Sequence, residues 1–187
     1  MKLLRALQTI TLFSLFLALP VWAADKPTTT VHRQMAGELD DSGWAVAKST
    51  EGGFTVKTPG KFTDATAVAS NPSSSVAASH LIVSSTVQGI KFTATRIKFR
   101  GGQDEAIKQF NKLKLTTGKL KYKSLKPMTM NKHEAMEGEL ENARSQLIQR
   151  TVLLDGELMT LIVEYPKTEE VVAKRLIPTY FSSLILE

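Results

Sequence analysis

The sequence lacks cysteine altogether and has only three histidines among its 187 residues. Without cysteine, the chain can form no disulfide framework, no cysteine-based zinc site, no iron–sulfur cluster, no thiol nucleophile and no lipid-anchored cysteine. It also lacks a long apolar run after residue 19, so no later segment is suited to crossing a membrane. What is present, 42% apolar and 22% charged residues, is the balance of a folded chain of one domain.

Residues 1–23 have the three parts of a secretory signal in order. Lys2 and Arg5 give a positively charged start, residues 10–19 are mostly apolar, and Val21 and Ala23 place small residues at a signal-peptidase site. The apolar stretch is about half the length that a membrane span needs. We therefore expect cleavage after Ala23 and a periplasmic or secreted protein with no integral membrane span.

The rest of the chain divides into a leader and one domain. Residues 24–43 mix Pro, Thr, Gly and Asp without a sustained period, so we expect a flexible leader there and a single domain over residues 44–187. Within the domain, period-two alternation predicts strands and helical spacing predicts helices. The strands are expected at 54–57, 63–69, 78–87, 90–99, 119–130, 134–140, 144–154 and 157–165, and the helices at 103–115 and from 168 onward.

Hairpins dominate this order of elements. Asp155 and Gly156 between two apolar runs are the strongest hairpin signal in the chain. Within 90–99 the alternation slips before Ile97 and Phe99, which predicts a β-bulge near residues 95–96 that keeps one face apolar. The predicted fold is therefore α+β, with a largely antiparallel sheet and two main helices packed on it.

The last helix has two signals of its own. Thr168 is the expected N-cap, and Pro178 is expected to kink or restart the helix. The apolar faces of strands and helices together predict a core. Its largest members should be mostly buried: Phe54, Phe92, Phe110, Leu161, Ile162 and Phe181.

Two stretches resemble a known family. Trp44 and residues 49–60, STEGGFTVKTPG, resemble the opening of the PsbP-like superfamily, including its exported bacterial DcrB-like members. The strand through residues 161–163 and the helix end YFSSL at 180–184 are similar to the family's close. The resemblance covers about residues 44–187. It implies an α/β/α sandwich around an antiparallel sheet, and a non-enzymatic accessory or binding protein with no shared catalytic residue. The metal-binding positions of the photosynthetic members find no match in this sequence, and we expect no cofactor.

No residue pattern indicates a catalytic site. There is no Gly-x-Ser-x-Gly elbow, and Ser79 and His80 are neighbours on a strand, so their side chains should point to opposite faces. Asp40 and Asp41 fall in the expected leader, where no fixed geometry supports acid–base chemistry. The glycine pairs at 52–53 and 101–102 lack the spacing and the lysine of a phosphate-binding loop.

A metal site has one set of candidates. His133, Glu137 and Glu139 share the parity of one predicted strand. A metal site needs three convergent ligands, which one strand face does not by itself provide. We interpret them as a turn histidine beside a solvated acidic face and predict no metal.

A lysine-rich run without any acid is the most unusual feature of the sequence. It contains Lys112, Lys114, Lys119, Lys121, Lys123 and Lys126. Such a run is either a docking patch for an acidic protein or an anionic envelope component, or a solvated helix end and strand face. Because only Tyr122 is interleaved with the lysines, and the net charge is only +6, we do not expect nucleic acid binding.

Strand alternation decides between these two interpretations. If 119–125 and 134–141 form a hairpin, apolar residues face each other only when paired residue numbers sum to an even value. Every such register puts Lys119, Lys121 and Lys123 on the face of the glutamates at 137, 139 and 141. We therefore predict ion pairing for these lysines. The binding candidates that would stay free are Lys112, Lys114 and Lys126.

The sequence thus predicts an exported, non-catalytic binding or accessory domain of the cell envelope. Its partner is expected to be a protein or an anionic envelope component. The alternative is a hydrolase or another enzyme whose active site is assembled from dispersed residues, which would need a deep pocket with a perturbed histidine or carboxylate.

Overall fold

The structure is a computed structural model that describes residues 28–68, 77–113 and 121–187. The expected signal segment, together with Lys114 and Lys119, lies outside the described residues. In chain order the elements are β1 (Thr28–Ala36), β2 (Trp44–Lys48), β3 (Phe54–Pro59), β4 (Phe62–Val68), β5 (Ala77–Val87), β6 (Ile90–Phe99), α1 (Gly102–Leu113), β7 (Lys121–Met130), β8 (His133–Glu141), β9 (Ser145–Leu154), β10 (Glu157–Pro166), the short 3-10 helix η2 (Lys167–Glu169), α2 (Glu170–Ser182) and β11 (Ile185–Leu186).

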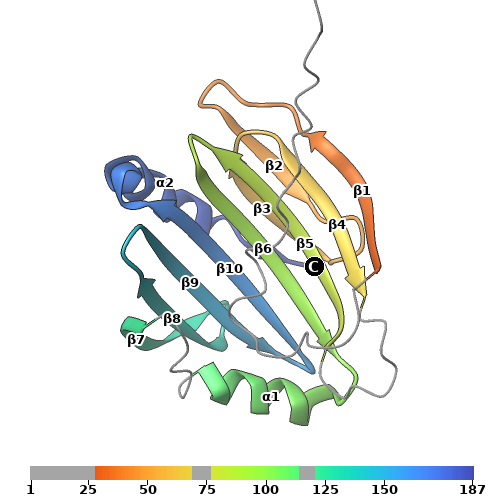
Figure 1. The fold of residues 1–187 in the computed structure, drawn as a ribbon. Coiled ribbons are helices and arrows are strands. Elements are labelled where there is room, and N and C mark those ends of the chain that lie inside the picture. The colour runs from red at the N-terminus through yellow and green to blue at the C-terminus, as the bar shows by residue number, and fades with distance from the viewer. Residues whose placement is uncertain (1–27, 69–76, 114–120) are drawn as a thin grey trace, which may run out of the picture.

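The strands form two antiparallel sheets (Figure 1). The larger has eight strands in the order β1-β4-β5-β6-β10-β9-β8-β7, and the smaller has three in the order β11-β3-β2. From β6 the chain passes through α1 to the far edge at β7 and returns strand by strand to β10, which pairs with β6. The predicted α+β fold, with a largely antiparallel sheet and two main helices, is confirmed, whereas the three-stranded sheet was not predicted.

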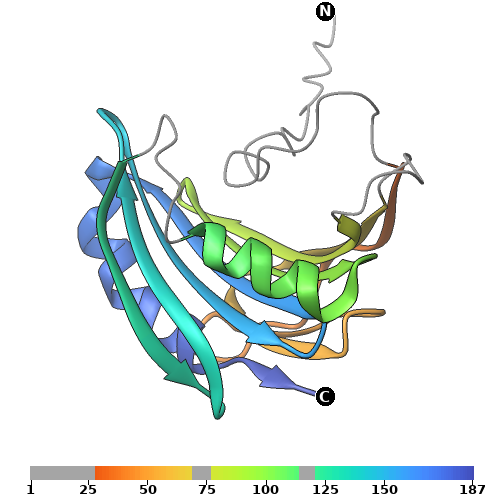
Figure 2. The ribbon, with the colours of Figure 1, turned by 90° about the horizontal axis from the view of Figure 1, so that it is seen from below.

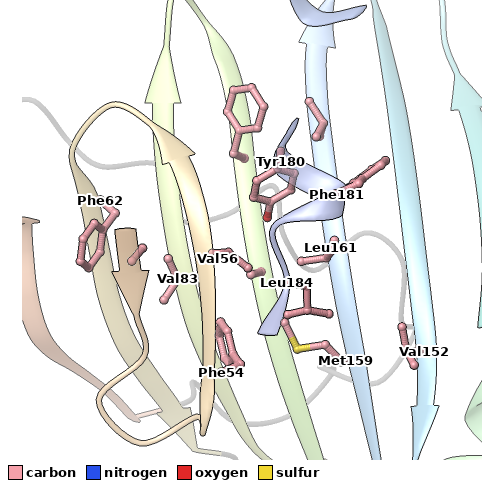
Figure 3. Packing of buried hydrophobic residues seen from close by; sticks show 14 of the residues in the cluster. Phe54, Val56, Phe62, Val83, Val152, Met159, Leu161, Tyr180, Phe181 and Leu184 are labelled. Atoms are coloured by element: carbon pink, nitrogen blue, oxygen red, sulfur yellow. The ribbon is translucent and has the colours of Figure 1, made fainter. Parts of the chain in front are cut away.

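Both faces of the large sheet carry packed apolar residues. On one face, the small sheet and α2 enclose the larger core cluster, whose biggest members include Phe54, Phe62, Leu161, Tyr180 and Phe181 (Figure 3). On the other face, α1 packs Ala106, Phe110 and Leu113 against Ile97 and Leu158. Figure 2 shows α1 on one side of the curved sheet, and α2 with the small sheet on the other.

The two-sided core explains why the predicted bulge at residues 95–96 is wrong. β6 keeps an unbroken register with β10 throughout. Its even positions, such as Phe92, face the larger cluster, while Ile97 and Phe99 face α1. The slip in the apolar pattern therefore marks the point where burial changes face, because α1 covers the opposite side there.

The expected leader also needs correction, because residues 28–36 form β1. This strand pairs with β4 from Thr28↔Val68 to Ala36↔Phe62. It escaped prediction because it is an edge strand with mostly exposed side chains, so no alternation of apolar and polar residues marks it. Its Thr-rich start has the β-branched residues that strands favour.

The last helix starts differently from the prediction, and it does not restart at its proline. Thr168 lies inside η2, and α2 starts at Glu170 behind Glu169, which makes no side-chain capping hydrogen bond. Pro178 lies inside α2, which continues through it to Ser182. Of the side chains predicted to be mostly buried, five are buried and Ile162 is half-buried, since it faces the α1 side of β10.

Candidate functional site

The two predicted basic residues that the structure describes, Lys112 and Lys126, do not lie in one patch. Lys112 is exposed in the last turn of α1. Lys126 lies on β7 directly opposite Glu137, whose partner Arg150 stacks on Phe181 of α2. Residues opposite each other in an antiparallel pair share a face, so Lys126 belongs to the α2 side of the sheet and Lys112 to the α1 side. Lys114, the third candidate, falls outside the described residues.

The predicted β7–β8 hairpin forms, but its register is right over only part of its length. Lys121 faces Glu141 and Tyr122 faces Leu140, as an even sum requires. A register shift at Lys123 then changes the sum to an odd value for the rest of the hairpin. Lys126, expected to lie apart from the glutamates, is therefore the residue opposite Glu137.

The shift has a packing cause further along β7. Past Lys123, Met128 stands opposite Ala135, and Met128 and Met130 both pack against the larger core cluster. Without the extra residue, these two methionines would face the α1 side instead. A β-bulge thus lets one strand present Lys123 near its start and two methionines near its end to the same side of the sheet.

Beside this bulge lies a shallow hollow on the α2 side. Its lining residues come from β7, β8 and β9: Lys123, Glu139, Leu140, Glu141, Gln146, Leu147 and Ile148. Tyr165 of β10 donates a 2.7 Å hydrogen bond from its hydroxyl to Gln146 Oε1. Burial, followed by the nearby carboxylates of Glu170 and Glu139, raises the pKa of this hydroxyl, so it stays a donor.

Charges of both signs alternate around the hollow. Lys174 Nζ lies 2.6 Å from Glu170 Oε1, and Lys167 Nζ lies 3.6 Å from Glu141 Oε2. The hydrogen bond from Lys174 lowers the pKa of Glu170, with weaker help from Lys123 and Lys167. Lys123, Lys167 and Lys174 each stand near a carboxylate, so this surface carries both charges and not an excess of positive charge.

Two buried or half-buried carboxylates hold the small sheet to the large one. Asp64 of β4 accepts hydrogen bonds from the backbone N–H of Thr50 at 2.8 Å and from Arg33 Nη2 at 3.1 Å. Glu157 of β10 pairs with Arg96 of β6. The other guanidinium nitrogen of Arg96 donates to the carbonyl of Gly52 at 2.9 Å. Both carboxylates therefore anchor the β2–β3 turn, which no motif in the sequence had indicated.

The large sheet carries a row of buried polar side chains on its α1 side. It consists of His80, Thr93, Thr95, Gln149, Thr151 and Thr160, which come from four neighbouring strands. Gln149 Nε2 donates to Thr151 Oγ1 at 2.8 Å, and Thr151 Oγ1 lies 3.4 Å from Thr160 Oγ1. Burial lowers the pKa of His80 to about 4, so the row is uncharged at neutral pH. Sequence reasoning missed it, because alternating threonines are equally typical of a solvated strand face.

Among the described residues, the catalytic and metal-ligand candidates considered from the sequence do not form a site. Ser79 and His80 follow each other on β5, where alternation places their side chains on opposite faces. His133 lies at the exposed start of β8, while Glu137 Oε2 accepts a 2.6 Å bond from Arg150 Nε. Within 28–68, 77–113 and 121–187, no three metal-binding side chains gather.

Comparison with known proteins identifies the fold. No protein-family model and no curated protein matches the sequence. The solution structure of cyanobacterial PsbP (CyanoP) from Synechocystis sp. PCC 6803 superposes with a TM-score of 0.51 at 11% identity, covering 81% of this chain and 97% of that one. The chain has the PsbP-like fold. This likeness concerns the fold alone.

A second solved structure has a lower similarity. LpqN of Mycobacterium tuberculosis, described as involved in cell envelope biogenesis, has a TM-score of 0.41 at 12% identity, covering 87% of this chain and 86% of that one. The PsbP-like fold agrees with the resemblance of residues 49–60 and 180–184. Among the described helices, none has the length and apolar character needed to cross a bilayer.

Proposed function

We propose that this protein is an exported, non-catalytic binding or accessory domain of the cell envelope. Export is supported by the charged start, apolar stretch and small-residue site of residues 1–23. We also assign the arrangement to an α/β/α sandwich, in which β2, β3 and β11 share one outer layer with α2.

The proposal that the protein is non-catalytic rests on the hydrogen-bond partners of its buried acidic side chains. Asp64 joins the two sheets through the backbone N–H of Thr50, and Glu157 joins them through Arg96, which donates to the carbonyl of Gly52. Glu105, buried on α1, accepts hydrogen bonds from Gln109 and Lys108 of the same helix. These carboxylates are committed to partners that position secondary structure, whereas an acid–base site needs a carboxyl group open to a substrate.

The surface around the hollow on the α2 side is the binding surface we propose. It combines exposed Lys123 with half-buried Glu139, Gln146 and Ile148, so it offers charge, amide and apolar contacts together. Such a mixture is typical of a protein partner, because electrostatic complementarity selects the partner and apolar burial stabilises the complex.

Charge reversal tests this proposal in the full chain exported from cells. A tagged chain carrying Glu139→Lys and Glu170→Lys should capture at least roughly tenfold less of its envelope partner than the wild type does, because the interfacial charges become repulsive. The matched control carries Asp41→Lys and Glu51→Lys, which change the net charge equally at exposed positions away from α2. The control should retain the partner.

Two results would count against the proposal. Equal capture by the wild type and both variants would place the binding surface elsewhere. Turnover of an ester, amide or glycoside by the purified chain would favour the hydrolase alternative. A thermal melt of each variant separates a lost interface from a lost fold.

A further inference from the structure

The open edge of β1 is a hydrogen-bonding surface that no described strand occupies. β1 ends the large sheet and pairs only with β4 among the described strands (Figure 1). From Thr28 to Val31 this pairing has a continuous register. The outer side of such a strand presents a row of unpaired N–H and C=O groups, and the structure that satisfies such a row best is another β-strand.

The opposite edge of the same sheet is protected, and the first part of β1, residues 28–31, is not. β7 contains Pro127, which lacks an N–H donor, and a register shift at Lys123. Its exposed lysines at 123 and 126 add like charges along that edge. Proline, bulges and lysines are the devices by which natural sheets block edge-to-edge pairing. Residues 28–31 of β1 contain none of them.

β1 is also held firmly in position for pairing. Arg33 Nη2 bonds to Asp64 Oδ2 at 3.1 Å, and its guanidinium lies 5.0 Å from the centre of the Phe62 ring. His32 Nε2 and Thr66 Oγ1 are 2.8 Å apart in a second link to β4. An added strand would therefore find an edge that needs little ordering, which reduces the entropic cost of association.

We propose that the partner strand is β1 of a second copy, paired antiparallel about a two-fold axis. The stretch from Thr28 to Val31 is uncharged, so self-pairing places β-branched side chains opposite each other without repulsion. Two-fold pairing also closes, leaving two protected β7 edges at the ends of a continuous sheet. Pairing β1 with β7 of another copy would be open-ended, and the protection of β7 prevents it.

The expected dimer is small and reversible. Only the regular part of β1 takes part, because its register with β4 shifts after Val31 and again after Arg33, and Met35 adopts a φ of 50°. An edge contact of this length falls in the range of transient interfaces. Dimer formation should therefore depend on concentration and be visible by sedimentation only in concentrated samples.

Cysteine cross-linking tests the proposal cleanly, because the natural chain contains no cysteine. Single substitutions Thr28→Cys, Thr29→Cys, Thr30→Cys and Val31→Cys are made in the full chain exported by cells. Residues that pair across a two-fold axis bring their Cα atoms within disulfide reach, about 4.5–5.5 Å. Only the residue on the axis faces its own copy, so one of the four positions should oxidise to a covalent dimer at least about fivefold faster than a matched Thr129→Cys on β7.

A second experiment, with charged substitutions, tests whether the added strand is β1 of a second copy or a strand of another protein. Thr30→Lys should weaken dimerisation roughly tenfold at low salt, and so should Thr30→Glu, because each places like charges at the axis. Mixing the two variants should restore it, which a mere loss of folding could not do. Cross-linking no faster than at Thr129, or adducts with another envelope protein instead of a dimer, would overturn the proposal.

Discussion

Truncating Phe181 to alanine should be among the most costly single changes in the molecule. Phe181 is 1% exposed and lies between α2 and the large sheet. Its ring centre is 5.6 Å from that of Tyr180, and the Arg150 guanidinium stacks over it at 4.5 Å. Removing a fully buried phenylalanine costs about 3–5 kcal/mol, because the apolar transfer energy is lost and a cavity is left.

Part of that cost should belong specifically to Arg150. The guanidinium is fixed by a 2.6 Å bond to Glu137, so it cannot simply follow the shortened side chain. A double-mutant cycle of Phe181→Leu with Arg150→Met should give a coupling energy of about 0.5–1 kcal/mol, the size of a partly exposed cation–π contact.

Urea denaturation followed by tryptophan fluorescence measures both quantities. After loss of residues 1–23, Trp44 would be the remaining tryptophan, and it packs against the larger core cluster. The matched control is Val171→Ala on the same helix, at a side chain that is 74% exposed, which should change stability by less than about 0.5 kcal/mol. A cost below about 1 kcal/mol for Phe181→Ala, with an unchanged m-value, would refute this account of the core.

Three further changes test other parts of the structure by the same denaturation assay. Asp64→Ala should destabilise by about 3 kcal/mol, and more than Arg33→Ala, because the carboxylate is buried and also bonds the β2–β3 turn, whereas Arg33 is partly exposed; equal costs would contradict this. Gly52→Ala should cost about 1–3 kcal/mol, because a Cβ there would lie 2.4 Å from the ring of Phe54; a neutral result would mean that the turn can move. The pKa of His80 is lowered to about 4, so below pH 6.5 the unfolded chain binds a proton that the folded chain does not. The free energy of unfolding should therefore fall by roughly 2 kcal/mol between pH 7 and pH 5. His80→Gln should reduce this fall, and an unchanged pH profile would contradict the burial of the ring.

The sequence predicted which neighbouring strands form hairpins better than it predicted which face of each strand is buried. Asp155 and Gly156 marked the β9–β10 hairpin correctly, because turn chemistry is local and needs only two residues. The prediction failed at Ile97 and Phe99 because it assumed one buried face, and only tertiary structure reveals that α1 covers the other. The register of β7 failed for a related reason, since the packing of Met128 outweighed the pairing of lysines with glutamates.

The candidate site was less predictable than the fold. The basic run is visible in the sequence, but whether Lys112 and Lys126 share a face depends on a crossing from α1 to the far edge of the sheet. The anchoring of the β2–β3 turn by Asp64 and Arg96 joins residues far apart in the chain, and no local pattern announces it. Edge strands such as β1 are also difficult to predict, because most of their side chains are exposed and the alternation of apolar and polar residues that identifies strands is missing.

Site-specific photo-cross-linking tests the central claim, that the chain binds a protein through its α2 side, most directly. A photoreactive residue replaces Lys123 beside the hollow and, as a matched control, Lys132 in the exposed β7–β8 turn. In cells exporting the full chain, we predict a discrete adduct with another envelope protein at Lys123, and none at Lys132. Adducts of equal yield at both positions, or none at Lys123, would contradict the claim.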